Sequence, residues 1–167
     1  MIHAGMNSKA ATAATADVVA WLKEAYTFGI TEELIGDLIN EVQHQGATSS
    51  AMYPVALHLI CLSQSSPPHV ALSLLSHSGV IYADARDPEA VPCPEFLEDE
   101  FEIHAAIAAR LLAPLLPVAE DFDGFKYGCA GLAGFSGHQE FGRFLVGLDF
   151  FDGKFFHNSQ EEPIGDK

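Results

Sequence analysis

Apolar residues recur three or four positions apart along most of the chain, the spacing typical of amphipathic helices. The first apolar stripe, over residues 18–28, follows Thr15, and the second, over residues 30–42, follows Thr31. Threonine is a favoured N-cap, and Gly29 stands where a glycine commonly ends a helix. The pattern therefore predicts a helical hairpin near the N-terminus.

The next two segments are predicted helices with different surroundings. Residues 51–63 are apolar on nearly every face, which is typical of a buried, central helix. Ser66 is followed by two prolines, an arrangement that favours a new helix with Ser66 as its cap. This second helix is expected to weaken near Gly79 or Ala83, and a strand over 79–83 is an alternative.

A proline-rich stretch over residues 86–94 predicts a loop that divides the chain into two halves. Beyond it, helical spacing begins at Glu95 and ends near Pro114. The expected core positions of this helix are Phe101, His104, Ala108 and Leu111. The later elements are expected to be a bend into 115–120, a turn over 121–124, and helices over 125–135 and 138–150, with a strand pair over 150–156 as an alternative to the end of the last helix.

These segments predict an all-α fold of six or seven helices joined mostly by short turns. Such helices can stack as antiparallel hairpins in a small HEAT- or armadillo-like solenoid, or pack as an irregular bundle. The expected organisation is a flexible leader over residues 1–14, a single helical domain over 15–156 and a flexible tail over 157–167.

The charge of the chain narrows the classes of partner. Eight Lys and Arg stand against 23 Asp and Glu, giving a net charge of −15, while 49% of the residues are apolar. The apolar content predicts a folded core, and the negative charge disfavours binding to nucleic acid or to an anionic membrane. No apolar run reaches the length of a membrane span without a proline, histidine or arginine, so no transmembrane segment is expected. The three cysteines lack metal-site or redox spacing, which favours a reducing cytoplasm.

About half of the excess negative charge lies in residues 84–102, which contain eight carboxylates and a single cation, Arg86. Such a stretch can attract a basic partner, and the aromatic residues within it could anchor the complex. The competing interpretation is a solvated helix start, because the helix dipole favours acidic residues there. The predicted partner-binding residues are Asp84, Asp87, Glu89, Glu95, Phe96, Glu98, Asp99, Glu100, Phe101 and Glu102.

Other candidate chemistry is weaker. Glu100 and His104 could face one metal from a helix, but paired ExxH or HExxH motifs are absent, so no metal or other cofactor is expected. The sequence around Ser136 only weakly resembles the GxSxG motif of a nucleophile elbow. Cys129 could pair with His138, but nothing in the sequence marks this cysteine as an activated nucleophile. The glycines at 128, 131, 134 and 137 recur every three residues but lack the strand and the Lys-Ser/Thr pair of a phosphate loop. Small residues such as Gly128, Gly131 and Gly134 favour close helix packing, and a concave surface that receives a partner's side chain is an alternative.

The segments 52–60 and 67–75, together with the Ala/Gly-rich helix around Tyr127, resemble consecutive helices of the HEAT-like modules found in some immunity proteins of bacterial polymorphic-toxin systems. The acidic insertion over residues 84–102 departs from a regular repeat. The resemblance implies a small, cytoplasmic, non-enzymatic inhibitor that binds and blocks a toxin domain.

We therefore expect an interaction protein with a basic protein partner, without binding to nucleic acid or membrane. The alternatives are a helical enzyme or small-molecule-binding domain around His104, Glu100 and the glycines, and a structural subunit of a larger complex. An exposed apolar patch and obligate oligomerisation would be the signs of a structural subunit.

Overall fold

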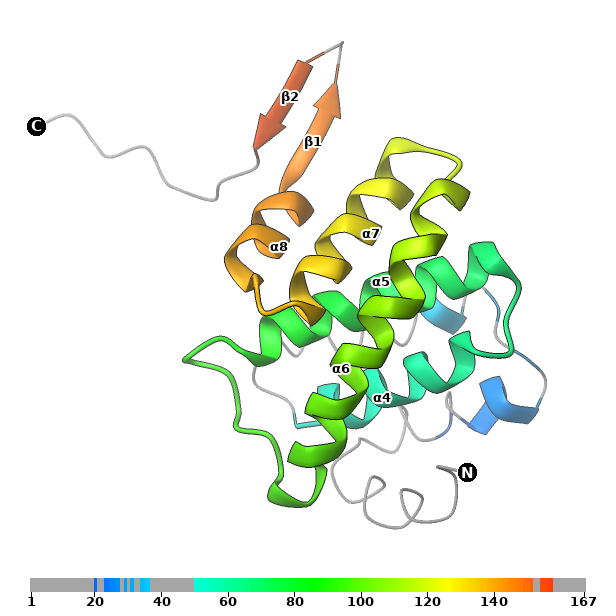
Figure 1. The fold of residues 1–167 in the computed structure, drawn as a ribbon, viewed down its shortest axis with the longest axis vertical. Coiled ribbons are helices and arrows are strands. Elements are labelled where there is room, and N and C mark those ends of the chain that lie inside the picture. Colours follow the sequence, from blue (N-terminus) through cyan, green and yellow to red (C-terminus); the bar gives the residue numbers. More distant parts are fainter. Residues whose placement is uncertain are drawn as a thin grey trace, which may run out of the picture.

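The structure is a computed structural model that describes residues 20, 23–27, 29, 31, 34–36, 50–151 and 154–157; side-chain surroundings are described up to Leu148. The described part is predominantly helical, as predicted, and forms an all-α bundle with one short β-hairpin (Figure 1). Its elements are α4 (Met52–Ser63), α5 (Pro68–Ala85), η3 (Glu95–Leu97), α6 (Glu98–Leu112), η4 (Ala113–Val118), α7 (Phe122–Phe135), α8 (Gln139–Val146), β1 (Leu148–Phe151) and β2 (Lys154–His157).

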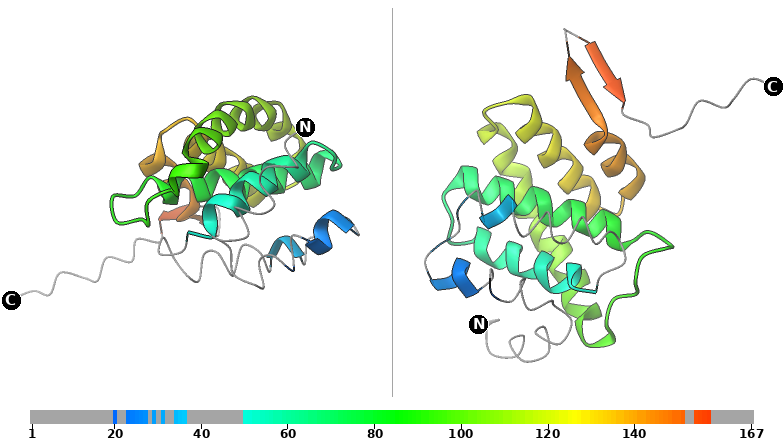
Figure 2. Two further views of the ribbon diagram at one scale, coloured as in Figure 1. Left: turned by 90° about the horizontal axis from the view of Figure 1, so that it is seen from below. Right: turned by 180° about the vertical axis from the view of Figure 1, so that it is seen from behind.

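Helix α5 is the element around which the bundle is built. It contacts α4, α6, α7, α8 and η4. In Figures 1 and 2, α6 crosses over one side of α4 and α5, while α7 and α8 lie together toward the end of the molecule that carries the hairpin. The helices therefore share one core, which includes the fully buried Val55, Leu59 and Leu74.

The two helices predicted after residue 50 are present, with changes at their ends. The N-cap of α5 is Pro67 rather than Ser66, whose hydroxyl instead donates a 2.8 Å hydrogen bond to the carbonyl of Leu62. Helix α5 also continues through Gly79 and Ala83, so the expected weakening and the alternative strand were wrong. Burial against neighbouring helices outweighs the low helix propensity of a single glycine.

Helix α6 lies within the predicted range but begins at Glu98, because Glu95–Leu97 form the 3-10 helix η3, and its buried face ends at another residue than predicted. The buried residues are Phe101, His104, Ala105, Ala108 and Leu112, whereas Leu111 is exposed. A step of four residues from Ala108 keeps Leu112 on the same face as Phe101, while the predicted step of three does not. A short segment does follow this helix, but it is the 3-10 helix η4, which begins at Ala113 and ends at Val118, before the predicted range of 115–120.

Helices α5 and α7 touch backbone to backbone through glycines. A methyl group built on Gly131 would lie 2.6 Å from the carbonyl oxygen of Ser76, and one built on Gly134 would clash with the carbonyl of Gly79. The glycines therefore serve close packing, as predicted. Gly131 and Gly134 are buried by α5, so the alternative of a concave surface open to a partner was wrong.

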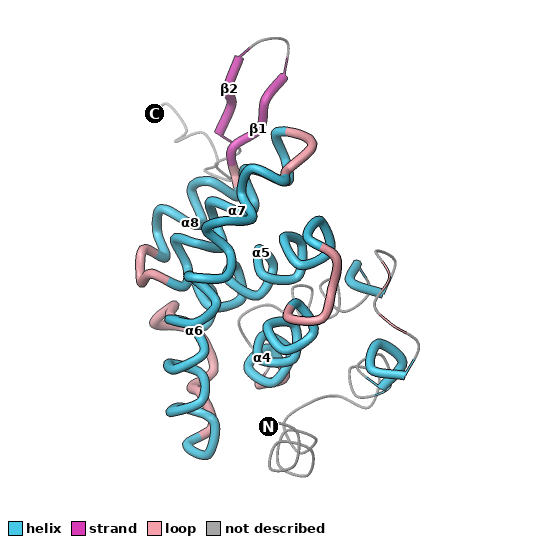
Figure 3. The backbone as a smooth tube through the Cα atoms, turned by 45° about the vertical axis from the view of Figure 1, so that its right-hand side comes forward, coloured by secondary structure: helices cyan, strands magenta, loops and turns pink. Residues whose placement is uncertain are grey.

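The C-terminal end differs from the predicted helix over 138–150. Helix α8 ends at Val146, and β1 and β2 then pair antiparallel, with Phe150 opposite Phe155. The hairpin projects from the helices in Figures 1 and 3. Aromatic residues favour strands, which explains why the strand-pair alternative is correct. His157 therefore belongs to β2 and not to the predicted tail.

Only parts of the predicted N-terminal hairpin are described. Residues 23–27 are helical, and Gly29 has a positive φ of 92° while its amide donates to the carbonyl of Ala25, as expected for a helix end. The Thr31 hydroxyl accepts a hydrogen bond from the amide of Leu34, which confirms the predicted cap. The cap at Thr15, the leader over 1–14 and residues 158–167 of the tail lie outside the described residues.

The stretch Glu95–Val118 is the part of the described chain that bears on the expectation about membrane spans. By length and composition alone it could cross a membrane, because its most apolar window has a mean hydropathy of 1.4. That window is only 28% buried, although α6 packs against α4, α5 and α7. The mean hydropathy has this value although the stretch contains His104 and Arg110, and most residues of the window are not buried inside the structure.

Candidate partner-binding site

The ten predicted contact residues do not form a single surface. Asp84 and Asp87, at the end of α5 and just beyond it, face Arg143 on α8. Asp84 Oδ1 lies 3.7 Å from Arg143 Nε, and Asp87 Oδ2 lies 2.7 Å from Arg143 Nη1. These two carboxylates therefore join α8 to α5, and their charge is partly balanced within the fold.

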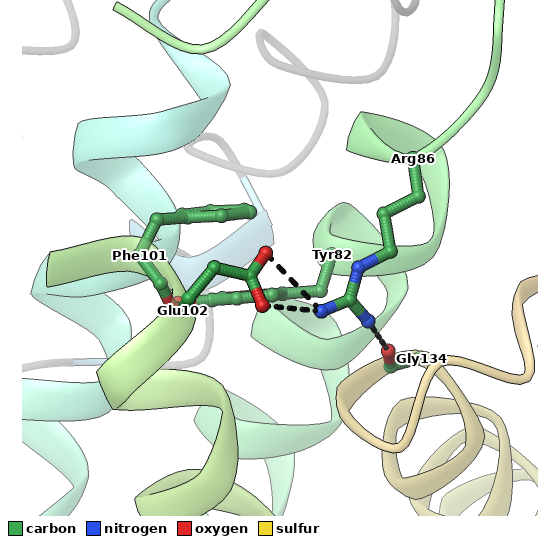
Figure 4. Close-up of polar contacts among 5 residues, drawn as sticks. All are labelled: Tyr82, Arg86, Phe101, Glu102 and Gly134. Carbon is green, nitrogen blue, oxygen red and sulfur yellow. Dashed lines mark hydrogen bonds and ion pairs between the residues drawn. The ribbon is translucent and has the colours of Figure 1, made fainter. Parts of the chain in front are cut away.

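Arg86 makes a second internal connection (Figure 4). Its Nη1 donates a 2.8 Å hydrogen bond to the carbonyl of Gly134, and its Nη2 lies 3.0 Å from the Glu102 carboxylate. The residue at the start of the loop thus joins α6 to the end of α7. The loop over 86–94 is present, but it does not divide the described chain into two independent halves.

Phe101 belongs to the core rather than to a contact surface. Its ring stacks on that of Tyr82, with centroids 3.7 Å apart and an angle of 3° between the planes (Figure 4). Tyr53 approaches the same ring edge-on, and the Tyr82 hydroxyl donates a 2.6 Å hydrogen bond to the carbonyl of Phe101. Burial raises the pKa of Tyr82, which therefore stays a neutral hydrogen-bond donor.

Four of the predicted residues remain exposed together at the start of α6, and we call them the acidic patch: Glu95, Phe96, Glu98 and Asp99. The Phe96 side chain is 44% exposed. Within the described part of the chain, no ion pair joins these carboxylates to a cation. Glu89 is also exposed on the preceding loop, whereas Glu100 is half-buried. The acidic patch is thus the part of the predicted surface that a partner could reach.

An apolar surface on α6 was missed by the sequence analysis. Ile103, Ile107 and Leu111 are 60%, 41% and 36% exposed. They recur every four residues on the outer side of the helix, opposite much of the buried face, and we call them the α6 ridge. Their spacing was a usable signal, but the helix was expected to have only one apolar face.

His104 does not form the metal pair considered with Glu100. Its Nδ1 lies 2.6 Å from the backbone carbonyl of Glu100, and its Nε2 is buried with no hydrogen-bond partner. Among the residues with described positions, no three His, Cys, Asp or Glu side chains are grouped as metal ligands would be. His104 lies in a packed interior, as do Gly128, Gly131 and Gly134, so these residues do not line an open pocket. Gly137 is exposed in the turn after α7.

A shallow depression of about 390 Å³ lies elsewhere, between α5 and the start of α7. His77 lines it and stacks on Tyr127, with ring centroids 5.7 Å apart, and its Nδ1 lies 2.8 Å from the carbonyl of Ser73. Burial lowers the pKa of His77, which favours its neutral form. The depression holds none of the residues that the sequence analysis associated with an enzyme.

The remaining nucleophile candidates lack activating surroundings. Ser136 lies in the turn after α7, not between a strand and a helix, so it does not form a nucleophile elbow. Burial raises the pKa of the Cys129 thiol, which favours the thiol over the reactive thiolate.

The two aspartates beside Arg143 should affect stability in opposite directions. Burial raises the pKa of Asp84 above 3.8, whereas the Glu89 amide and then Arg143 lower the pKa of Asp87 below 3.8. The Asp87 charge therefore stabilises the fold above its ordinary pKa, and this stabilisation is lost as the pH falls through the lowered pKa. The Asp84 charge disfavours the fold above its raised pKa, and this penalty disappears at lower pH.

Asp87→Asn is therefore expected to lower the melting temperature at pH 7, with a smaller loss near pH 3. Asp84→Asn is expected to leave the melting temperature at pH 7 unchanged or to raise it. Thermal unfolding followed by circular dichroism at both pH values checks this. Equal losses for both variants at pH 7 would contradict the opposite roles of the two charges.

Comparison with known proteins adds no family to this description. No protein-family model, no curated protein and no solved structure matches the chain.

Proposed function

We propose that this protein is a non-enzymatic interaction protein that binds a basic protein partner through the start of α6. The observation that carries the proposal is the acidic patch, where three exposed carboxylates lie within three residues of the exposed Phe96 along the chain. The carboxylates would attract and orient a cationic surface, and the phenylalanine would add apolar contact once the surfaces meet.

The overall charge supports the same kind of partner. A net charge of −15 repels acidic proteins and phosphate backbones at long range and attracts basic domains. The internal pairs formed by Arg86 and Arg143 leave the acidic patch without a nearby described cation to neutralise it. A basic protein would supply the missing positive charge.

Within this class, we propose an immunity- or inhibitor-type role in which the protein occludes a toxin or effector domain in the bacterial cytoplasm. The resemblance of the α4 and α5 segments to HEAT-like immunity proteins supports this finer proposal. An effector that acts on nucleic acid would have a basic active-site surface, and an acidic inhibitor could cover that surface by charge complementarity.

Neutralising the acidic patch with Glu95→Gln, Glu98→Gln and Asp99→Asn should slow association with the basic partner. We expect a reduction of about threefold to tenfold at low salt and a weaker dependence of the rate on salt, because steering scales with the local charge. The partner would be captured from host lysate at low salt, identified by mass spectrometry, produced separately and studied by surface plasmon resonance.

A matched control removes the same number of charges from exposed positions elsewhere, with Glu24→Gln, Glu120→Gln and Glu140→Gln. This variant should associate at a rate closer to that of the unaltered protein. If both triple variants slow association equally, only net charge matters and the acidic patch is not the contact site. A separate assay tests the inhibitor role directly: the unaltered protein should inhibit the activity of the identified partner.

A further inference from the structure

The α6 ridge is an apolar surface on a helix that already buries its opposite side. Phe101, Ala108 and Leu112 pack into the core, while Ile103, Ile107 and Leu111 face outward. A helix that is apolar on both sides is typical of one covered on both sides. In Figures 1 and 3, α6 is an outer helix of the described bundle, with its outer side uncovered by the other labelled elements.

The form of the ridge fits a second helix. Its three side chains are spaced by one helical turn each and span about 12 Å along the axis. Ala106, which follows Ile103 by about one turn, is small and exposed, so a partner's side chain could pack beside the larger residues. Helices that bind in this way present apolar residues three and four positions apart.

The charged residues near the ridge indicate which charge a bound partner segment should carry. The acidic patch lies at the N-terminal end of the ridge, where Asp99 precedes Ile103 by one turn, while the exposed Arg110 follows Ile107 by about one turn near the other end. A second copy of this chain would bring another charge of −15 to the same surface, which electrostatic repulsion disfavours. A cationic segment would instead gain charge complementarity along the acidic end.

We infer that the α6 ridge is the docking surface for a cationic, amphipathic helix of a partner protein. The inference rests on the proposed function and extends it by naming the binding element. The partner's apolar stripe lies on Ile103, Ile107 and Leu111, and its positive charges lie toward Glu98 and Asp99. The carboxylates then mainly set the rate of association, whereas the ridge mainly sets the rate of dissociation.

The test uses the full chain and a synthetic helical peptide of about 18 residues, which is five turns, built from leucine on one face and lysine on the other. The ridge variant is Ile103→Gln, Ile107→Gln and Leu111→Gln, since glutamine is polar, uncharged and compatible with a helix. The control variant, Phe141→Gln, removes an apolar side chain that is 57% exposed on α8. Unaltered melting temperatures would show that all variants fold.

At 0.15 M salt the ridge variant should raise the peptide's dissociation constant by about tenfold or more, mainly through faster dissociation. Phe141→Gln should have little effect. A peptide of the same composition with its leucines scattered around the helix should bind more weakly than the amphipathic one. A leucine–glutamate peptide should not bind, because the acidic patch repels it.

Several results would overturn the inference. If the patch variant slows association but the ridge variant binds normally, the proposed function stands and the ridge is not the docking surface. If neither variant changes binding, neither the patch nor the ridge has its proposed role. Equal binding of the leucine–glutamate peptide would exclude a cationic preference.

Two further measurements test the other possible occupants. Sedimentation of the unaltered protein as a dimer, with the ridge variant a monomer, would show that a second copy occupies the ridge. Co-sedimentation with phosphatidylcholine vesicles that is lost in the ridge variant would show that the ridge binds a membrane. Either result would replace the cationic helix as the occupant.

Discussion

Replacing Gly131 with alanine is expected to destabilise the fold by about 3 kcal/mol, one of the largest effects of a single methyl group in this chain. The added carbon would lie 2.6 Å from the carbonyl oxygen and 2.8 Å from the Cα of Ser76. Both atoms belong to the backbone of α5, so relief requires the two helices to separate. Because α5 contacts most of the bundle, that separation would disturb packing beyond α7.

Chemical denaturation followed by circular dichroism measures the free energy of unfolding, and in a thermal unfolding experiment the melting temperature should fall by about 10 °C. Gly36→Ala is the matched control, because a methyl group on Gly36 meets no atom within 4 Å. Because alanine has a higher helix propensity than glycine, this substitution should leave the stability of the protein unchanged or increase it by up to about 1 kcal/mol. A Gly131→Ala protein as stable as the control would show that α5 and α7 are not held at backbone contact.

Phe101→Ala should destabilise the protein by about 3–5 kcal/mol, because it removes a large buried ring and leaves a cavity between Tyr53 and Tyr82. The Tyr82 hydroxyl would keep its hydrogen bond to the backbone at position 101 but lose the ring beneath it. The same denaturation measurement checks this value.

Phe96→Ala provides the comparison, since this side chain is 44% exposed and should change stability by less than about 0.5 kcal/mol. The two phenylalanines were predicted to have the same role in partner contact. A large effect of Phe96→Ala on stability together with a small effect of Phe101→Ala would reverse the assignment of core and surface.

The fold was predictable where a local pattern decided the structure. The apolar composition of residues 51–63 was sufficient to predict the buried helix α4, and the glycines of α7 correctly indicated close packing. The end of α8 was harder, because Phe150 fits both the helical spacing and an aromatic strand. Pairing with Phe155, a partner later in the chain, decided between them.

The candidate site was predictable only in part, because the sequence does not show where each carboxylate finds a cation. Arg86 was counted as one charge within the acidic stretch, yet its contacts with Glu102 and Gly134 fix α6 against α7. Arg143 lies far along the chain from Asp87, so that pair had no local signal. The α6 ridge was missed since Leu111 was assigned to the core in place of Leu112.

The glycine contact between α5 and α7 also restricts how this sequence can diverge. Gly79 faces Gly131 and Gly134, so a side chain gained at any one of the three positions meets the main chain opposite. The three glycines should therefore be inherited together or lost together as the helices move apart. A distant relative of this chain would be recognisable by that linked set, one glycine in an earlier helix and two glycines three residues apart in a later one, even where the surface sequence has changed completely.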